Sequence, residues 1–260
     1  MIIEGISNDD YHSSPELSRS TAWNVLKTCP ARVRYDKENP GKSSSALILG
    51  NGFHSAFLEP KLFEEEYEIK PKQIDGNSPL TKAYKEKFQQ MKDENPGKTW
   101  LSLSEWEMCS DMANSASSHS FIQEQFQNDK FIIEGTGFFE CEGIKCKVRP
   151  DLYSPTSGMI IDLKSTQDAS EEAFRLSVKK FGYGFQVAWY MEGLRRMGCK
   201  ATDFVFLAVE KKPPYLRACY RVNQFEIDHQ IKQMKRACKL WKQCVQAETF
   251  PGYSPEIITL

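Results

Sequence analysis

Hydrophobic positions in the first half of the chain recur mostly at helical spacing. Helices are predicted over residues 21–28, 46–59, 80–92 and 102–126. Ser18 or Ser20 is expected to cap the first of these helices and Ser104 the last, and Pro30 and Pro60 are expected to end the first two. The stretch from about 70 to 98 is polar, which indicates a surface insertion that is helical only in part.

After about residue 127 the pattern changes to short β-prone segments separated by Gly, Pro and Ser turns. Strands are predicted over residues 131–134, 137–141, 144–152, 159–164, 204–209 and 218–222. Helices are predicted over residues 171–179, 185–197 and 224–247. These elements predict an α/β fold with a central mixed β-sheet flanked by helices. We expect one domain over 1–260, with a helical N-terminal part over about 1–126 and a core over about 127–260.

Composition adds three constraints. The 260 residues carry 35 acidic and 34 Lys or Arg side chains, so positive charge for nucleic acid has to be gathered locally. Eight scattered cysteines without a CxxC pair favour free thiols in a reducing cytoplasm over an iron–sulfur or zinc site. The chain has neither a secretory signal pattern nor an apolar run of ~20 residues, so we expect a cytoplasmic protein without a membrane partner.

A predicted hairpin carries the candidate chemistry. Its first arm ends near Asp151, and its second arm is 159–164. Because side chains alternate along a strand, Asp162 and Lys164 share one face while Ile161 and Leu163 occupy the other. Asp151 can approach Asp162 across the hairpin.

Such a group suits phosphodiester hydrolysis. Two carboxylates can hold Mg²⁺ through oxygen, and a lysine can position or deprotonate the attacking water. The alternative is a solvent-exposed ion pair between Asp162 and Lys164, because the pattern D-x-K is common by chance. Spacing and strand phase alone leave the two interpretations balanced.

Ordered motifs along the chain strengthen the first interpretation. Pro150-Asp151 with Ile161-Asp162-Leu163-Lys164 resembles the core motif of the PD-(D/E)xK nuclease superfamily. Further motifs resemble its RecE-type exonuclease (exonuclease VIII) branch, which is related to the lambda-type and RecB-type nucleases. These motifs are Leu17-Ser18-x-Ser20, Gly50-x3-His54 with Leu58-Glu59-Pro60, Gln186-x3-Tyr190 and Phe204-Val205-Phe206-Leu207. The resemblance spans residues from about 14 to 255, so it implies one exonuclease domain.

The resemblance implies a role for each matching residue. The implied metal ligands are His54, Asp151, Asp162 and the backbone carbonyl of Leu163, and the implied catalytic residues are Asp151, Asp162, Lys164, Glu134, Gln186 and Tyr190. Lys164 would activate the water, and Gln186 and Tyr190 would face the scissile phosphate from one side of a helix. Glu140 is an alternative to Glu134 as the additional acidic residue.

Several of these residues also have ordinary structural interpretations. His54 lies at helical spacing with Leu47 and Leu58, residues expected to be buried, and could be a core histidine. Gln186 and Tyr190 could be a half-buried helix pair, and Glu134 a solvated charge at a strand end.

Candidate DNA contacts lie on both sides of the hairpin motif. Lys145, Lys147 and Arg149 alternate along a predicted strand, so they share a face that either lines a DNA channel or is simply solvated. Thr166 either contacts phosphate or caps the next helix.

The resemblance further implies a Mg²⁺-dependent exodeoxyribonuclease, with Mn²⁺ as a possible substitute. Such enzymes degrade linear double-stranded DNA processively from 5′ ends and leave 3′ single strands for recombination. They are typically phage-borne, act beside a single-strand annealing protein and form homo-oligomeric rings, so we expect a trimer or tetramer. Two alternatives remain: a nuclease of different specificity (a single-strand exonuclease or an endonuclease), and a non-catalytic DNA-binding protein on the same fold.

Overall fold

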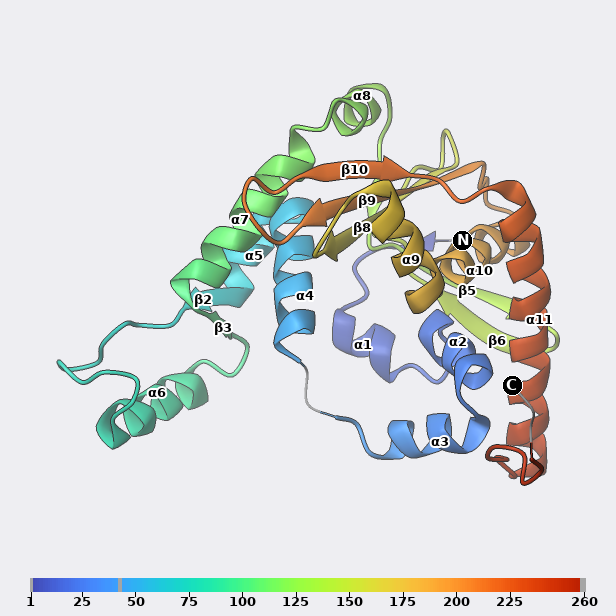
Figure 1. Ribbon diagram of the computed structural model, residues 1–260, viewed down its shortest axis with the longest axis horizontal. Helices are drawn as coiled ribbons and strands as arrows, with labels where there is room; N and C mark the ends of the chain where they lie inside the picture. Colours follow the sequence, from blue (N-terminus) through green and yellow to red (C-terminus); the bar gives the residue numbers. More distant parts are fainter. Residues whose placement is uncertain (1, 42–43, 258–260) are drawn as a thin grey trace.

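Two β-sheets form the centre of the protein in the computed structural model, which describes residues 2–41 and 44–257 (Figure 1). The larger sheet has five strands in the order β10-β9-β8-β7-β4. They are β4 (Ile132–Ile133), β7 (Leu152–Tyr153), β8 (Met159–Thr166), β9 (Asp203–Glu210) and β10 (Arg217–Tyr220). Strands β8 and β9 pair in parallel, whereas the other neighbours pair antiparallel. The mixed sheet predicted from the sequence is therefore confirmed.

A second, antiparallel sheet has the order β1-β5-β6. Its strands are β1 (Ile2–Ile3), β5 (Thr136–Cys141) and β6 (Ile144–Val148). Strand β1 was not predicted, because two residues are too short to show an alternating pattern. Its pairing with β5 joins the first residues of the chain to a sheet of the C-terminal half.

Two further short strands frame the polar insertion. Strands β2 (Tyr67–Ile69) and β3 (Thr99–Leu101) pair in parallel, and α6 (Lys82–Glu94) lies between them in the sequence. Figure 1 shows α6 extending to the left, away from the two sheets. The prediction of a partly helical surface insertion is confirmed, while the two strands were missed.

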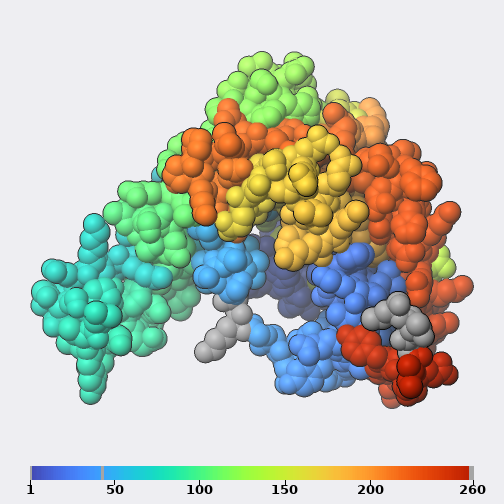
Figure 2. Space-filling view, viewed as in Figure 1, coloured from blue at the N-terminus to red at the C-terminus, as the bar shows by residue number. Residues whose placement is uncertain are grey.

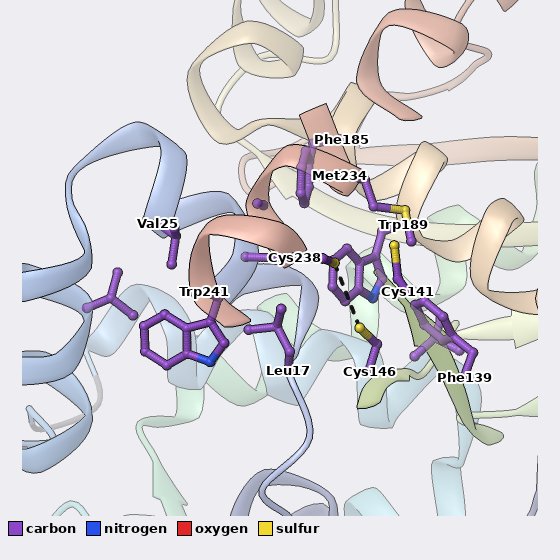
Figure 3. Packing of buried hydrophobic residues seen from close by; sticks show 14 residues of the cluster. Leu17, Val25, Phe139, Cys141, Cys146, Phe185, Trp189, Met234, Cys238 and Trp241 are labelled. Atoms are coloured by element: carbon purple, nitrogen blue, oxygen red, sulfur yellow. Dashed lines mark hydrogen bonds between the residues drawn. The ribbon is translucent and has the colours of Figure 1, made fainter. Parts of the chain in front are cut away.

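Helix α10 (Tyr183–Arg196) fills the space between the two main sheets. Its Val187 and Leu194 belong to a buried cluster with Phe204 and Phe206 of β9. Its Phe185 and Trp189 pack instead with the second sheet and with helices α2 (Arg19–Lys27) and α11 (Gln224–Ala247) (Figure 3). A helix that is apolar on nearly every side has to be buried on nearly every side, which fixes α10 and the polar residues that it carries.

The cluster in Figure 3 also brings cysteines together. Cys146 of β6 lies with its Sγ 3.9 Å from the Sγ of Cys238 of α11, and both side chains are fully buried. All eight cysteines are free thiols. Here they act as small apolar side chains in a core, as expected from their scattered positions.

The described part of the N-terminal half contains eight helices, and all but α6 lie near the sheets. They are α1 (Asn8–Ser13), α2, α3 (Pro30–Glu38), α4 (Ser45–Leu58), α5 (Pro60–Glu66), α6, α7 (Leu103–Ser117) and α8 (Ser120–Asn128). Ser18 caps α2 by accepting a hydrogen bond from the N–H of Thr21, as predicted. Pro30 and Pro60 do end the preceding helices, but each also begins a new one, because proline fits the first helical turn.

Three N-terminal predictions need correction. The expected helix over 102–126 is two helices, and Ser102 rather than Ser104 caps the first, in a reciprocal capping box with Glu105. Leu47 is 52% exposed rather than buried, because the face of α4 that packs on α7 carries Phe53 and Ala56 instead.

The C-terminal helices lie close to their predicted positions. Helix α9 (Glu171–Phe181) and α10 follow β8, and α11 has the predicted bounds. Among the described residues, no helix combines the length and apolar character that crossing a membrane requires.

Candidate active site

The β7–β8 hairpin holds the motif residues as predicted. Leu152 pairs with Ile161, and the N–H of Leu163 donates a 2.7 Å hydrogen bond to Oδ2 of Asp151, just before β7. Ile161 and Leu163 are buried in the cluster that faces α4 and α7. Strand alternation therefore sends Asp162 and Lys164 to the opposite face, toward α10.

Asp162 is almost completely buried, with 1% of its surface exposed. Its Oδ2 accepts a 2.5 Å hydrogen bond from Nε2 of Gln186 on α10. Its Oδ1 accepts a hydrogen bond from the ammonium group of Lys164, which lies two residues further along β8. A carboxylate buried to this extent needs such partners, because an unpaired buried charge is costly. The exposed ion pair considered from the sequence is therefore wrong.

Lys164 is held by two aromatic rings as well as by Asp162. Its Nζ lies 5.0 Å from the ring centroid of Tyr183 and 5.5 Å from that of Phe206. Cation–π attraction and the carboxylate restrict the ammonium to one place. The side chain stays 15% exposed, so it can still meet a substrate.

Helix α4 brings His54 to the same hairpin. Its Nδ1 lies 3.5 Å from Oδ2 of Asp151, the same oxygen that accepts the hydrogen bond from the N–H of Leu163. Burial, and then the positive charge of Lys164, lower the pKa of His54 to about 4. The ring is therefore neutral near pH 7, which is the form that binds a metal ion.

Asp151 is the second acid of the site, and its side chain is largely buried, with 14% of its surface exposed. Burial, and then the nearby charge of Asp162, raise its pKa to about 8. Two acids in one poorly solvated place repel each other, and a divalent cation relieves this repulsion.

The donor set suits such a cation in part. The Asp151 carboxylate, the His54 imidazole and the Leu163 backbone converge, and oxygen ligands with one nitrogen suit Mg²⁺ or Mn²⁺. The Asp162 carboxylate is directed toward Lys164 and Gln186 instead. Accordingly, residues 2–41 and 44–257 contain no group of three His, Cys, Asp or Glu side chains already arranged around a metal position.

Of the two candidate acids, Glu134 rather than Glu140 lies beside Asp151. Glu134 follows β4, its N–H donates to the carbonyl of Asp151, and its Oε2 lies 3.9 Å from Nη1 of Arg149. Burial, and then the charge of Asp151, raise its pKa. Glu140 lies exposed on β5, opposite Lys145. Glu134 is thus partly buried beside Asp151, and the interpretation as a solvated strand-end charge is wrong.

A pocket of about 590 Å³ opens in front of Lys164. Gln186 and Tyr190 of α10 line it together, as their spacing of four residues predicted. Residues 11–16, which include the end of α1, and the start of α2 form the opposite wall. Figure 2 shows the hollow in this face, with the dark blue α1 deep within it between the gold α9 and the blue α2.

Arg19, on α2, is a site residue that the sequence analysis missed. Its Nη2 donates to Oε1 of Gln186 at 3.3 Å and to the carbonyl of Gly182 at 3.0 Å. Gln186 thus accepts from Arg19 and donates to Asp162, which fixes the orientation of its amide. One signal was present: a cation in the first turn of a helix opposes the helix dipole, so such a residue needs another reason to be there.

The pocket wall also contains two buried polar atoms without partners. Nε of Arg19 and Oε2 of Glu16 have no hydrogen-bond partner among the described residues. Both residues line the pocket with Lys164. Buried groups without a partner are costly in free energy.

The predicted basic face of β6 does not exist as expected. Lys147 and Arg149 are only 3% and 8% exposed, and Lys145 alone of the three is exposed. The Lys147 ammonium donates to the carbonyls of Tyr11 and Ser14. Both cations are buried because residues 6–16 cover β6. The backbone carbonyls of this segment accept hydrogen bonds from the two cations, which offsets the cost of burying their charge.

Arg149 holds the same N-terminal segment. Its guanidinium donates to Oδ1 of Asn8 at 2.9 Å, to Oγ1 of Thr136 at 3.0 Å and to the carbonyl of Ile6. The shared exposed face predicted for Lys147 and Arg149 is therefore wrong. Lys147 nevertheless borders the pocket that contains Lys164.

Thr166 ends β8, and its hydroxyl donates to the carbonyl of Asp168 at 2.9 Å. The N-cap residue of α9 is Ser170, so the alternative in which Thr166 caps that helix is wrong. A phosphate contact by Thr166 stays a prediction.

Comparison with known proteins agrees with this geometry. Residues 19–259 match the family described as "PDDEXK-like domain of unknown function (DUF3799)". The crystal structure of a "Putative exonuclease" from Eubacterium rectale superimposes with a TM-score of 0.61 at 16% identity, covering 92% of this chain and 87% of that one. A phage related exonuclease from Haemophilus somnus 129PT has a TM-score of 0.38 at 14% identity, covering 92% and 99%. No curated protein matches the sequence.

At 16% identity the first structure bears on the fold alone, and the second is too distant to support an argument. The family match covers nearly the whole chain and includes every candidate metal ligand and catalytic residue, from His54 to Tyr190. The resemblance to the PD-(D/E)xK superfamily and the predicted fold class are thereby confirmed. With its hairpin, buried aspartates and adjacent lysine in place, the chain belongs to the family of PDDEXK-like domains.

Proposed function

We propose that this protein is a divalent-metal-dependent deoxyribonuclease. The observation that supports this best is the meeting of Asp151, Asp162 and Lys164 on one hairpin, with His54 beside Asp151. A non-catalytic DNA-binding protein has no chemical need for a buried acid pair beside a restrained ammonium group.

Each group has a part in the proposed hydrolysis. Asp151, His54 and the Leu163 carbonyl would hold a Mg²⁺ or Mn²⁺ ion, and Asp162 would join them by turning from Lys164. The bound ion supplies acidity to a coordinated water and neutralises charge on the phosphate. Lys164, once released from Asp162, would orient the attacking water, and it could accept the proton of that water at Nζ only after its ammonium group has lost a proton to solvent.

The residues behind the acids position them. Gln186 holds Oδ2 of Asp162, and Arg19 holds Gln186 in turn. Tyr190 lies on the same side of α10, and burial raises the pKa of its hydroxyl well above the usual value. It therefore stays protonated and can donate a hydrogen bond to a phosphate oxygen.

We further propose that the substrate is linear double-stranded DNA, degraded processively from 5′ ends to leave 3′ overhangs. The ordered motifs that resemble RecE-type exonucleases support this proposal. With a formal net charge of −1, a single subunit would hold DNA weakly. A ring of three or four subunits would enclose the duplex, so the DNA could not dissociate sideways even though each subunit binds it weakly. A single-strand annealing protein would use the product, and we place the reaction in the cytoplasm of a bacterial cell.

The test is incubation with 5′-labelled, 3′-labelled and covalently closed duplexes, in Mg²⁺, Mn²⁺ and EDTA. We expect cleavage only with metal and only of linear DNA, with mononucleotides released first from the 5′-labelled end. Cutting of closed circles would favour an endonuclease, and cutting of single strands alone would favour a single-strand exonuclease. DNA binding without cleavage under every metal condition would refute a catalytic role.

A further inference from the structure

The outer face of α11 carries a concentration of positive charge. From residue 229 to 247 the sequence has five cationic side chains and no acidic one, in a chain whose formal net charge is −1. The five are Lys232, Lys235, Arg236, Lys239 and Lys242. Figure 1 shows α11 along the right-hand edge of the molecule, with α2 and α10 packed on its inner side. None of the five lines the pocket that contains Lys164, so this charge is gathered away from the catalytic residues.

Helical spacing places the five cations on one side of α11. Each lies three or four residues from another of the set, and residues at that spacing share a helix face. The opposite side carries Met234, Cys238 and Trp241, which are buried in the cluster with α2 and α10. Four of the cations are exposed, and Lys242 is partly buried, with its Nζ donating to the carbonyl of Glu142 at 3.2 Å. The core therefore fixes α11 with its cationic face toward solvent.

These cations lack the acidic partners that other surface helices of this protein provide. Helices α3, α6, α9 and α10 each hold an ion pair between residues four apart. Within residues 2–41 and 44–257, none of the five cations of α11 forms an ion pair. Like charges at this spacing repel each other and destabilise a helix. A polyanion lying along α11 would relieve this repulsion.

Three of the cations also line a shallow hollow of about 520 Å³. Lys235, Arg236 and Lys239 form one side of it. Glu142, in the turn between β5 and β6, borders the other side, so three cations face one carboxylate. The cationic face extends beyond the hollow at both ends, to about 15 Å along the helix axis. Since duplex DNA carries one phosphate charge per ~1.7 Å of its axis, this length can meet several phosphates.

We propose that the cationic face of α11 binds the phosphate backbone of double-stranded DNA outside the catalytic pocket. Between residues 232 and 246 the single aromatic side chain, Trp241, is only 7% exposed, so the face offers no ring on which unpaired bases could stack. Binding through charge alone is independent of sequence and favours the duplex, which has a higher charge density than a single strand. The inference rests on the proposed nuclease function, which supplies DNA as the substrate.

The test is fluorescence anisotropy with a labelled duplex over a series of salt concentrations, in EDTA to prevent cleavage. The logarithm of the affinity should fall linearly with the logarithm of the salt concentration, with a slope of about −0.9 for each phosphate contact. In the triple variant Lys235→Gln, Arg236→Gln and Lys239→Gln, the slope should be smaller by about 2–3 and the affinity should fall about tenfold. An unchanged slope and affinity would point to another partner, such as an acidic protein segment, and would overturn the proposal.

Two further variants show whether the effect belongs to α11. The triple variant Lys82→Gln, Lys85→Gln and Lys87→Gln removes the same charge from exposed positions of α6 and should bind DNA like the wild type. An equal loss of affinity in this control would mean that net charge alone sets the affinity, against a site on α11. Lys235→Arg with Lys239→Arg keeps the charge and should retain the affinity. Thermal melting of each variant confirms that it is folded.

A single strand of the same length tests the choice of duplex DNA. The loss of affinity between the wild type and the α11 triple variant should be larger for the duplex than for the single strand. A larger loss for the single strand would show that the face follows one strand, and the proposed duplex surface would be wrong.

Cleavage separates this inference from the proposed function. With Mg²⁺ and linear duplex, the α11 triple variant should have a higher KM and a kcat close to that of the wild type, because its residues lie outside the catalytic pocket. If the wild type cleaves DNA but the variant keeps the wild-type affinity and salt slope, the α11 surface is refuted and the nuclease proposal stands. If the wild type binds duplex through α11 but cleaves with no metal, the nuclease proposal is refuted and the surface stands.

Discussion

The buried acid pair predicts that the site destabilises the protein in the absence of metal. Asp151 has a pKa of about 8, against about 3.9 in an unfolded chain. The folded state therefore binds more protons than the unfolded state between these two values. In that window stability falls as pH rises, and the loss is complete only above the folded pKa.

The magnitude follows from the same shift. Between pH 4 and pH 7 the full linkage would remove about 4 kcal/mol, at 1.36 kcal/mol for each pH unit. Asp151 keeps 14% of its side chain exposed, so hydration of the charged form reduces the cost, and we expect about 2 kcal/mol. Asp151→Asn retains an oxygen that can accept from the Leu163 N–H and cannot ionise. At pH 7 in EDTA this variant should melt about 4–8 °C above the wild type.

The assay is thermal unfolding followed by circular dichroism at pH 5, 6, 7 and 8, in EDTA. The gap in melting temperature between Asp151→Asn and the wild type should be small at pH 5 and widen toward pH 8. In Mg²⁺, where the wild type is expected to cleave, the variant should be inactive. Asp228→Asn, an exposed residue on α11, is the matched control and should follow the wild type. A variant that melts below the wild type at pH 7, or a gap that is independent of pH, would refute this reasoning about Asp151.

Further variants test the remaining groups. Asp162→Ala and Lys164→Ala should each abolish cleavage while the protein stays folded by circular dichroism, and near wild-type turnover in either would remove the active site from this hairpin. His54→Ala should raise the Mg²⁺ concentration needed for activity and respond to Mn²⁺, whereas a purely structural histidine would change only the melting temperature. Arg19→Met should lower kcat more than it raises KM, because it releases Gln186 from its place beside Asp162; equal loss of both parameters would contradict this. Light scattering should show a trimer or tetramer, and a monomer that cuts closed circles would exclude the ring.

Many of the helices and strands could be predicted from the sequence, because they depend on local patterns of residues. The alternation of Ile161, Asp162, Leu163 and Lys164 predicted which side chains would share a face. The bounds of α11 followed from its helical spacing. Both depend on residues that are close in the sequence.

Contacts between distant segments could not be predicted in this way. Lys147 and Arg149 have the alternation of an exposed basic face, yet residues 6–16 cover them and accept their hydrogen bonds. A strand pattern predicts which residues share a face, but it does not predict which other segment of the chain packs on that face. Arg19 likewise reaches Gln186 across 167 positions of the sequence.

The sequence by itself therefore determined the hairpin, the phase of its acids and lysine, and the helix that carries Gln186 and Tyr190. The tertiary structure decided which glutamate lies beside Asp151 and which basic side chains are buried. It also decided that an arginine from another helix hydrogen-bonds Gln186. It placed Glu134 rather than Glu140 beside Asp151. The physical reason is that periodicity is a property of one segment, whereas burial and charge compensation depend on the segments that fold against it.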